Sequence, residues 1–255
     1  RVARSASDKM GILKVEGGYH GSYDPFVVSA KPPLDKAGDP EEPTAVMDSN
    51  LVPGDIYVVP YNNAPALEAM FEKNASKIAC FIVEPVLENL AIILPDAGYL
   101  ERVRELCDEY NVILIFDEVK TGLTAGAHGA SVRLGVEPDL ITLAKSIGGG
   151  VPLAAFGGKK KYMDFVTNGK MAHFGTFNGN PLAMAGVRAI DRLCSDQALA
   201  DAEALNQQAL DRISEIIDEY QLPAHTVGFG VKGCVTWSTT PVRNYRDYKA
   251  TDFGI

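Results

Sequence analysis

The sequence has little of what metal sites, disulfide frameworks and membrane spans require. It contains 4 cysteines and 4 histidines in 255 residues. The cysteines form no C-x-x-C pair and the histidines are scattered, so neither a zinc site nor a set of disulfides is predicted. A reducing cytoplasm is therefore the simplest compartment. No apolar run approaches the roughly 18 residues of a membrane-spanning helix, so we expect no membrane partner.

Positive charge is also scarce. The formal net charge is −9, whereas a nucleic-acid-binding surface usually needs clustered basic side chains. Three consecutive lysines occupy positions 159–161, and such a short run is predicted to begin a helix or to face water. We therefore expect no nucleic-acid partner.

Apolar runs alternate with helical patterns through the middle of the chain. Strands are predicted at 78–86, 112–119, 140–145 and 153–158, and helices at 98–111 and 130–139. The run at 112–119 is almost continuously apolar, as a buried parallel strand should be. Strand, helix and strand at this spacing predict right-handed crossovers, and therefore an α/β fold with a mainly parallel sheet and flanking helices.

The two ends of the chain differ from this middle part. Residues 182–220 have a strongly helical pattern, and strand-like pieces follow Pro223. We expect a large domain over 1–205 and the beginning of a small α+β domain over 206–255. The first residues read as the inside of a helix and the last ones lack a cap, so we expect a fragment trimmed at both ends.

The segment 21–60 is rich in proline and glycine. A loop of this length inside a compact domain is usually a lid, a binding loop or a disordered stretch. The composition alone does not decide among these three.

Ionisable residues end three of the predicted strands. They are Glu84, Asp117 and Lys145. Ligands of such sheets bind at the carboxyl ends of the strands, and a buried charge there is costly unless it is paired or functional. Taken alone, Asp117 could form a salt bridge or cap a helix, and Lys145 could be a surface lysine. Taken together, they are what pyridoxal phosphate chemistry needs: a lysine that forms an imine and an aspartate that keeps the pyridine nitrogen protonated.

Five motifs in order carry a family resemblance. They are "EGGYHGSYD" (16–24), "EPVLENLAIILPDAGYLERVRELC" (84–107), "FDEVKTG" (116–122), "DLITLAKSIGGGVPLAAFGG" (139–158) and "GTFNGNPLAMA" (175–185). These motifs resemble the class III aminotransferases of PLP fold type I, and within them the branch of the glutamate-1-semialdehyde 2,1-aminomutases. The resemblance covers nearly the whole chain and implies the PLP fold type I large domain.

The resemblance implies roles for the residues at matching positions. Lys145 resembles the Schiff-base lysine, and Asp117 the aspartate that pairs with the pyridine nitrogen of pyridoxal 5'-phosphate. Val119 would pack on one face of the cofactor ring and Tyr19 would stack on the other.

Four further residues are implied around the cofactor. Asn89 matches the asparagine that reaches the ring hydroxyl. Glu84 would be a supporting carboxylate near Asn89 or have a purely structural role, and His20 would support the fold near Tyr19 or take part in catalysis. Thr176 resembles the threonine that binds the cofactor phosphate from the neighbouring subunit, which implies a homodimer with a shared site.

Two parts of the sequence limit which residue roles can be assigned from the family resemblance. The glycines at 148–150 resemble a phosphate loop, but a P-loop has its lysine after the glycines. We expect them instead to let the backbone turn tightly beside Lys145. The stretch "TGLTAGAHGA" lacks the aromatic residue and the arginine that often follow in the family, so substrate contacts are not carried over from it.

The expected function is a PLP-dependent amino transfer. An amino group would move between an amino acid or amine and a keto or aldehyde acceptor through a Schiff base of Lys145. One alternative is a glutamate-1-semialdehyde 2,1-aminomutase, in which the same molecule receives the amine back. A second alternative is a non-catalytic truncated relative that keeps the fold and only binds partners.

Overall fold

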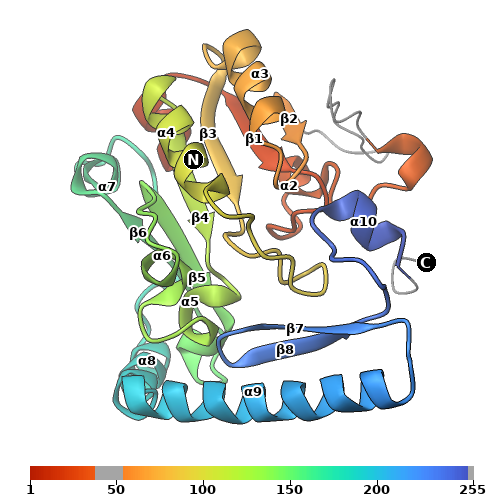
Figure 1. The fold of residues 1–255 in the computed structure, drawn as a ribbon. Helices are drawn as coiled ribbons and strands as arrows, with labels where there is room; N and C mark the ends of the chain where they lie inside the picture. The colour runs from red at the N-terminus through yellow and green to blue at the C-terminus, as the bar shows by residue number, and fades with distance from the viewer. Residues whose placement is uncertain (38–53, 252–255) are drawn as a thin grey trace.

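A six-stranded sheet forms the centre of the molecule (Figure 1). The computed structural model describes residues 1–37 and 54–251. The strand order is β2-β1-β3-β4-β5-β6. The strands are β1 (Gly11–Val15), β2 (Ile56–Val59), β3 (Ile78–Val83), β4 (Ile113–Asp117), β5 (Leu140–Ala144) and β6 (Ala154–Gly158). The first five are parallel and β6 runs antiparallel to β5. The short 145–153 connection explains β6, because a parallel neighbour needs a crossover of a dozen or more residues.

Helices cover both faces of this sheet. On one face lie α3 (Ala64–Asn74) and α4 (Tyr99–Glu109), and on the other lie α1 (Val2–Ser7) and α7 (Lys160–Thr167). Side chains alternate between the two cores along each strand: Leu13 packs into the first core and Ile12 into the second. The predicted α/β fold with a mainly parallel sheet and flanking helices is therefore confirmed.

The shorter helices refine the predictions. They are α2 (Asp24–Val27), η1 (Leu34–Lys36), α5 (Thr121–Thr124), α6 (Gly129–Arg133) and η2 (Lys145–Gly148). The helix predicted over 130–139 is shorter, because Gly135 adopts a left-handed backbone with φ 70°. The segment 21–60 contains α2, η1 and β2, so it is not one continuous loop. Part of this segment, residues 38–53, lies outside the described residues, so the choice among lid, binding loop and disordered stretch stays open.

The C-terminal part consists of a helix pair, a hairpin and a final short helix. These are α8 (Pro181–Leu193), α9 (Asp196–Glu219), β7 (His225–Phe229), β8 (Lys232–Thr236) and α10 (Tyr245–Lys249). The long α9 runs along the β7–β8 hairpin (Figure 1). The predicted domain boundary near residue 205 falls inside α9, and the division into two domains stays a prediction.

The hairpin is docked onto the sheet domain at its turn. Val231 N donates a hydrogen bond to Thr124 O at 2.8 Å. Gly230 has φ 60°, and a Cβ atom built there would come 1.9 Å from Thr124 O. Only glycine fits this close approach, which fixes the hairpin beside α5 and hence beside the carboxyl ends of the strands.

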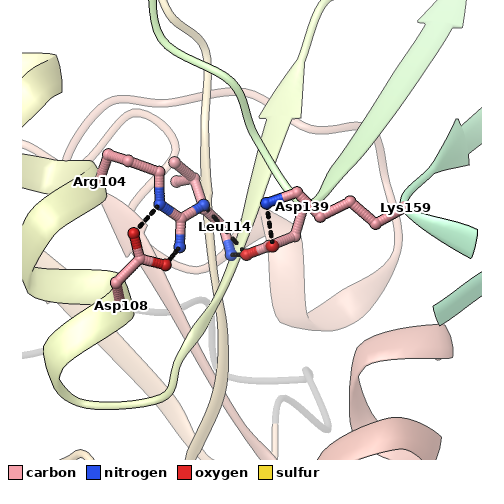
Figure 2. Close-up of polar contacts among 5 residues, drawn as sticks. All are labelled: Arg104, Asp108, Leu114, Asp139 and Lys159. Carbon is pink, nitrogen blue, oxygen red and sulfur yellow. Dashed lines mark hydrogen bonds and ion pairs between the residues drawn. The ribbon is translucent and has the colours of Figure 1, made fainter. Parts of the chain in front are cut away.

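An ion cluster around the buried Asp139 connects several elements near the amino end of β5 (Figure 2). Asp139, just before β5, accepts hydrogen bonds from Leu114 N at 2.9 Å and from the Arg104 guanidinium at 3.0 Å. Its other oxygen accepts from Lys159 Nζ at 2.9 Å. Burial opposes ionisation of Asp139, but these donors outweigh it and lower the pKa of the carboxyl. The cluster joins α4, β4, β5 and the start of α7 at the amino end of β5.

Candidate functional site

A cavity of about 250 Å³ lies at the carboxyl ends of the parallel strands. Of the residues predicted from the sequence, it is lined by Tyr19, His20, Glu84, Asn89, Asp117, Val119 and Lys145. It is also lined by Gly21, Phe26, Ile82, Lys120 and Thr142. Thr176 does not line the cavity and lies on an exposed turn. The structure therefore brings together seven residues that the sequence spreads over 127 positions from Tyr19 to Lys145.

Asp117 is the last residue of β4 and is buried at the bottom of this cavity. Its Oδ1 accepts a hydrogen bond from Val119 N at 3.0 Å, and its Oδ2 lies 2.8 Å from His20 Nδ1. Burial opposes ionisation, but the hydrogen bonds from His20 and from Val119 N–H outweigh it and hold the pKa of Asp117 below its ordinary value. Among the described residues no lysine or arginine forms an ion pair with it. Asp117 therefore keeps a negative charge that faces the cavity.

His20 is the partner that orients this carboxylate. Its side chain has no exposed surface, and its ring packs edge-on against Phe26 with centroids 5.8 Å apart. Burial lowers the pKa of His20, although the hydrogen bond to Asp117 opposes this effect. The imidazole is therefore neutral at neutral pH and donates its Nδ1–H to Asp117. The structure places His20 against Asp117 in the lining of the cavity, and the choice between support of the fold and catalysis stays a prediction.

Glu84 connects two turns on the other side of the cavity. It follows β3 and is 3% exposed. Its Oε1 accepts from Tyr19 N at 3.0 Å, and its Oε2 accepts from Asn89 Nδ2 at 2.9 Å. Burial raises the pKa of Glu84 to about 7, although the Tyr19 N–H opposes this rise. Glu84 thus holds the backbone of Tyr19, a cavity-lining residue that is 43% exposed.

The buried carboxyl of Glu84 predicts a pH-dependent stability. Between pH 4.5 and about 7 the unfolded chain releases this proton while the folded chain keeps it, so the folded state loses stability as the pH rises. The shift corresponds to about 3 kcal/mol. Relative to the wild type, Glu84→Gln should therefore gain about 3 kcal/mol of unfolding free energy from pH 4.5 to pH 7. Urea unfolding of the cofactor-free protein across this range measures the difference.

An exposed glutamate gives the control for this prediction. Glu101→Gln on α4 removes one carboxylate from the surface and should leave the pH dependence as in the wild type. A wild-type and Glu84→Gln pair with parallel pH profiles would contradict the buried, protonated Glu84.

Lys145 stands where β5 ends and η2 begins. Its φ is 52°, which lies in the left-handed region that non-glycine residues rarely adopt. Such local strain occurs preferentially at functional sites. Gly149 and Gly150 also have positive φ, and a Cβ on Gly149 would come 2.9 Å from Ile190 Cγ1 on α8. The glycines therefore make a tight turn against α8, as the sequence predicted, and Lys145 is aimed at the cavity.

Several lining residues were missed from the sequence. Lys120 lies beside Val119 and donates from Nζ to Glu88 O at 2.8 Å. Thr142 is on β5 and Ile82 is on β3, each near the end of a predicted strand, so strand alternation could have found them. Phe26 carries no signal of its own, because it comes from the short α2.

The comparisons with known proteins agree with this architecture. The family description "Aminotransferase class-III" matches residues 1–244. A glutamate-1-semialdehyde 2,1-aminomutase from Francisella philomiragia is 39% identical over 232 residues, which are 90% of this chain and 53% of that protein. The chain thus spans about half the length of this curated relative.

Solved structures share the fold. An omega-transaminase from Sphaerobacter thermophilus superimposes with a TM-score of 0.88 at 30% identity, over 97% of this chain and 58% of that one. A glutamate-1-semialdehyde aminomutase from Pseudomonas aeruginosa, solved in complex with PMP, has a TM-score of 0.83 at 24% identity, over 98% and 56% of the two chains. Within residues 1–37 and 54–251, none of the helices combines the length and apolar character that crossing a bilayer requires.

Proposed function

Because this chain belongs to the class III aminotransferase family, we propose that it forms the cofactor site of a PLP-dependent aminotransferase. The enzyme would move an amino group between an amino acid or amine and a keto or aldehyde acceptor. One observation carries the proposal: the buried carboxylate of Asp117 and the amine-bearing side chain of Lys145 line the same cavity at the strand ends. The family match over residues 1–244 supports it.

The cavity residues fit pyridoxal 5'-phosphate. When bound, this cofactor supplies an aldehyde that links to amines and a protonated ring that draws electrons from the carbon beside the amine. Asp117, which pairs with no lysine or arginine in the described part of the chain, would hold the protonated ring nitrogen. Lys145 would supply the attaching amine, and Tyr19 and Val119 would border the two ring faces. Asn89, already oriented by Glu84, would reach the ring hydroxyl.

Two side chains of the protein, His20 and Lys145, would then have separate roles. His20 donates to Asp117 and keeps the carboxylate in one orientation. In the first half of the transfer Lys145 Nζ would be the base that takes the proton from the substrate carbon bearing the amine. In the second half it would be the acid that gives a proton to the acceptor carbon that receives the amine. A lysine must be a neutral amine to act as this base.

An aminomutase is the second candidate. The curated relative from Francisella philomiragia carries that name and matches 90% of this chain. An aminomutase would convert glutamate-1-semialdehyde without any added keto acid, whereas an aminotransferase would need a second substrate. Product analysis with and without pyruvate as the acceptor distinguishes the two. A non-catalytic relative would have no need of the combined Lys145 and Asp117.

Covalent labelling tests the proposed cofactor site. Mixing the purified protein with PLP should give a visible absorbance band, and borohydride should then fix one cofactor per chain. Peptide mass analysis should find it on Lys145 and not on Lys120, the second amine that lines the cavity. A protein that acquires no label, or a label on Lys120 alone, would refute the assignment.

We further propose a homodimer in which Thr176 binds the cofactor phosphate of the neighbouring subunit. Large apolar side chains are exposed around it, with Phe174 93%, Phe177 80% and Leu182 69% exposed. A surface of this kind is typical of an interface. Such a position would leave Thr176 outside its own cavity.

Subunit mixing tests the shared site. Thr176→Ala removes one hydrogen bond to a charged group and should weaken PLP binding by about tenfold to a hundredfold, while Thr167→Ala on α7 should not. In a mixed dimer of Lys145→Ala and Thr176→Ala chains, one site would contain both native residues, so half of the sites should regain wild-type affinity. If no native-like site forms in the mixed dimer, Thr176 does not act across subunits.

A further inference from the structure

A lysine is buried in the sheet directly beneath the cavity. Lys14 lies in β1 opposite Ile82 of β3, and its side chain has no exposed surface. Along β1 it alternates with Leu13 and Val15, which belong to the core under α3 and α4. Lys14 therefore points to the other face, the face of Ile12 and Ile82. A fully buried lysine is rare and needs strong partners.

The partners of Lys14 are two backbone carbonyls of the α2 segment. Its Nζ donates to Phe26 O at 3.1 Å and to Val28 O at 2.7 Å. The same segment is tied to the sheet once more, because Gly17 N donates to Ser29 O at 2.8 Å. Lys14 thus fixes the backbone of a residue that lines the cavity.

Phe26, whose carbonyl accepts from Lys14, contacts His20 through its ring. Its ring meets the His20 ring at 72° with centroids 5.8 Å apart. His20 in turn forms the 2.8 Å hydrogen bond to Asp117. The His20 side chain is fully buried and Phe26 is partly buried against the core that contains Ile12 and Ile82. Close packing leaves little room for alternative rotamers, so the position of Phe26 limits where the imidazole can lie.

The positive charge of Lys14 also acts on His20. Burial lowers the pKa of Lys14 to about 7, and the negative charge of Glu84 opposes this. The lysine also contributes to the lowered pKa of His20, after burial and against the effect of Asp117. The charged groups that act on His20 are Asp117 from β4, which it contacts directly, and Lys14 from β1.

We propose that Lys14 is a positioning residue that holds the His20–Asp117 pair in its working geometry through the backbone and ring of Phe26. The inference rests on the proposed function only in its last step, where this pair serves the cofactor. Lys14 lies in the sheet interior and does not line the cavity, yet it would determine the geometry of two residues that do.

Histidine NMR on the full-length, cofactor-free protein tests the proposal. With ring-labelled histidine, the His20 signals are assigned by their loss in His20→Gln. Lys14→Met keeps the length of the side chain and removes its N–H donors and charge. In this variant the loss of the positive charge alone should raise the titration midpoint of His20. The loss of positioning should in addition expose the Nδ1 proton that donates to Asp117 to exchange with water.

A partly exposed lysine with the same kind of backbone contacts provides the control. Lys9 Nζ also donates to two backbone carbonyls, Ala75 O at 2.9 Å and Asn111 O at 3.2 Å, at the edge of the sheet far from the cavity. Lys9→Met should lower stability as the loss of such a clamp does, yet leave both His20 readouts at their wild-type values. Lys14→Met with unchanged His20 signals would reduce Lys14 to a structural clamp and overturn the proposal.

Phe26→Leu keeps the proposal testable if Lys14→Met does not fold. This variant retains the carbonyl acceptor and removes the ring that contacts His20. It should raise the midpoint and expose the Nδ1 proton in the same way, and unchanged signals would overturn the proposal. Because none of these readouts needs the cofactor, a displaced His20 in a protein that takes no borohydride label on Lys145 would refute the proposed function alone.

Discussion

Replacing Lys145 with alanine should abolish covalent attachment of the cofactor and lower amino transfer by roughly 10⁴-fold, the upper range for loss of a positioned proton-transfer group. The substitution removes the amine that lines the cavity beside Asp117. Absorbance after addition of PLP, borohydride labelling and steady-state rates measure the two effects.

The loss should not come from unfolding. Lys145 is exposed and has φ 52°, and alanine at this backbone angle meets the same restriction as lysine. The unfolding free energy of Lys145→Ala should therefore stay within about 0.5 kcal/mol of the wild type. Lys120→Ala removes the other lining amine and should still accept the borohydride label on Lys145. A Lys145→Ala protein that retains both its cofactor band and its rate would exclude Lys145 as the attachment point.

The central strands could be predicted because of their burial. Strands covered by helices on both faces are almost continuously apolar, and β3, β4 and β5 were each found close to their observed bounds. The meeting of Glu84, Asp117 and Lys145 followed from the same prediction, since the carboxyl ends of parallel strands share one edge. β2 was missed because its four residues fall in a segment whose proline and glycine content indicated a loop.

The contacts that tune the site could not be predicted in the same way. The hydrogen bond between His20 and Asp117 joins residues 97 positions apart, and it depends on the register that places β1 beside β3 and β3 beside β4. Sequence periodicity does not fix such a register between distant strands. Lys14 did carry a signal, a lysine inside the apolar run "GILKV". The reasoning applied to Lys145 would have identified it, because a buried charge demands partners.

The second large effect is expected at Asp117. Asp117→Asn keeps the shape of the side chain but removes the negative charge. The carboxylate accepts from two donors at once, Val119 N–H on Oδ1 and His20 Nδ1–H on Oδ2. An asparagine can accept on only one of these positions, and its NH₂ group then faces a second donor. We therefore expect a loss of about 1–3 kcal/mol of stability and a fall in rate of roughly 10²- to 10³-fold.

A charged cofactor analogue separates the two consequences of this substitution. If Asp117 serves to keep the ring nitrogen protonated, an N-methylated pyridoxal phosphate carries that positive charge permanently and needs no carboxylate for it. The analogue should then restore most of the lost rate in Asp117→Asn, while the loss of stability in the cofactor-free protein remains. A His20→Leu variant gives the comparison, because it leaves the carboxylate charged and removes its orienting donor. A failure of the analogue to restore Asp117→Asn, with the analogue shown to be bound, would mean that Asp117 acts through the architecture of the site and not through the charge of the ring.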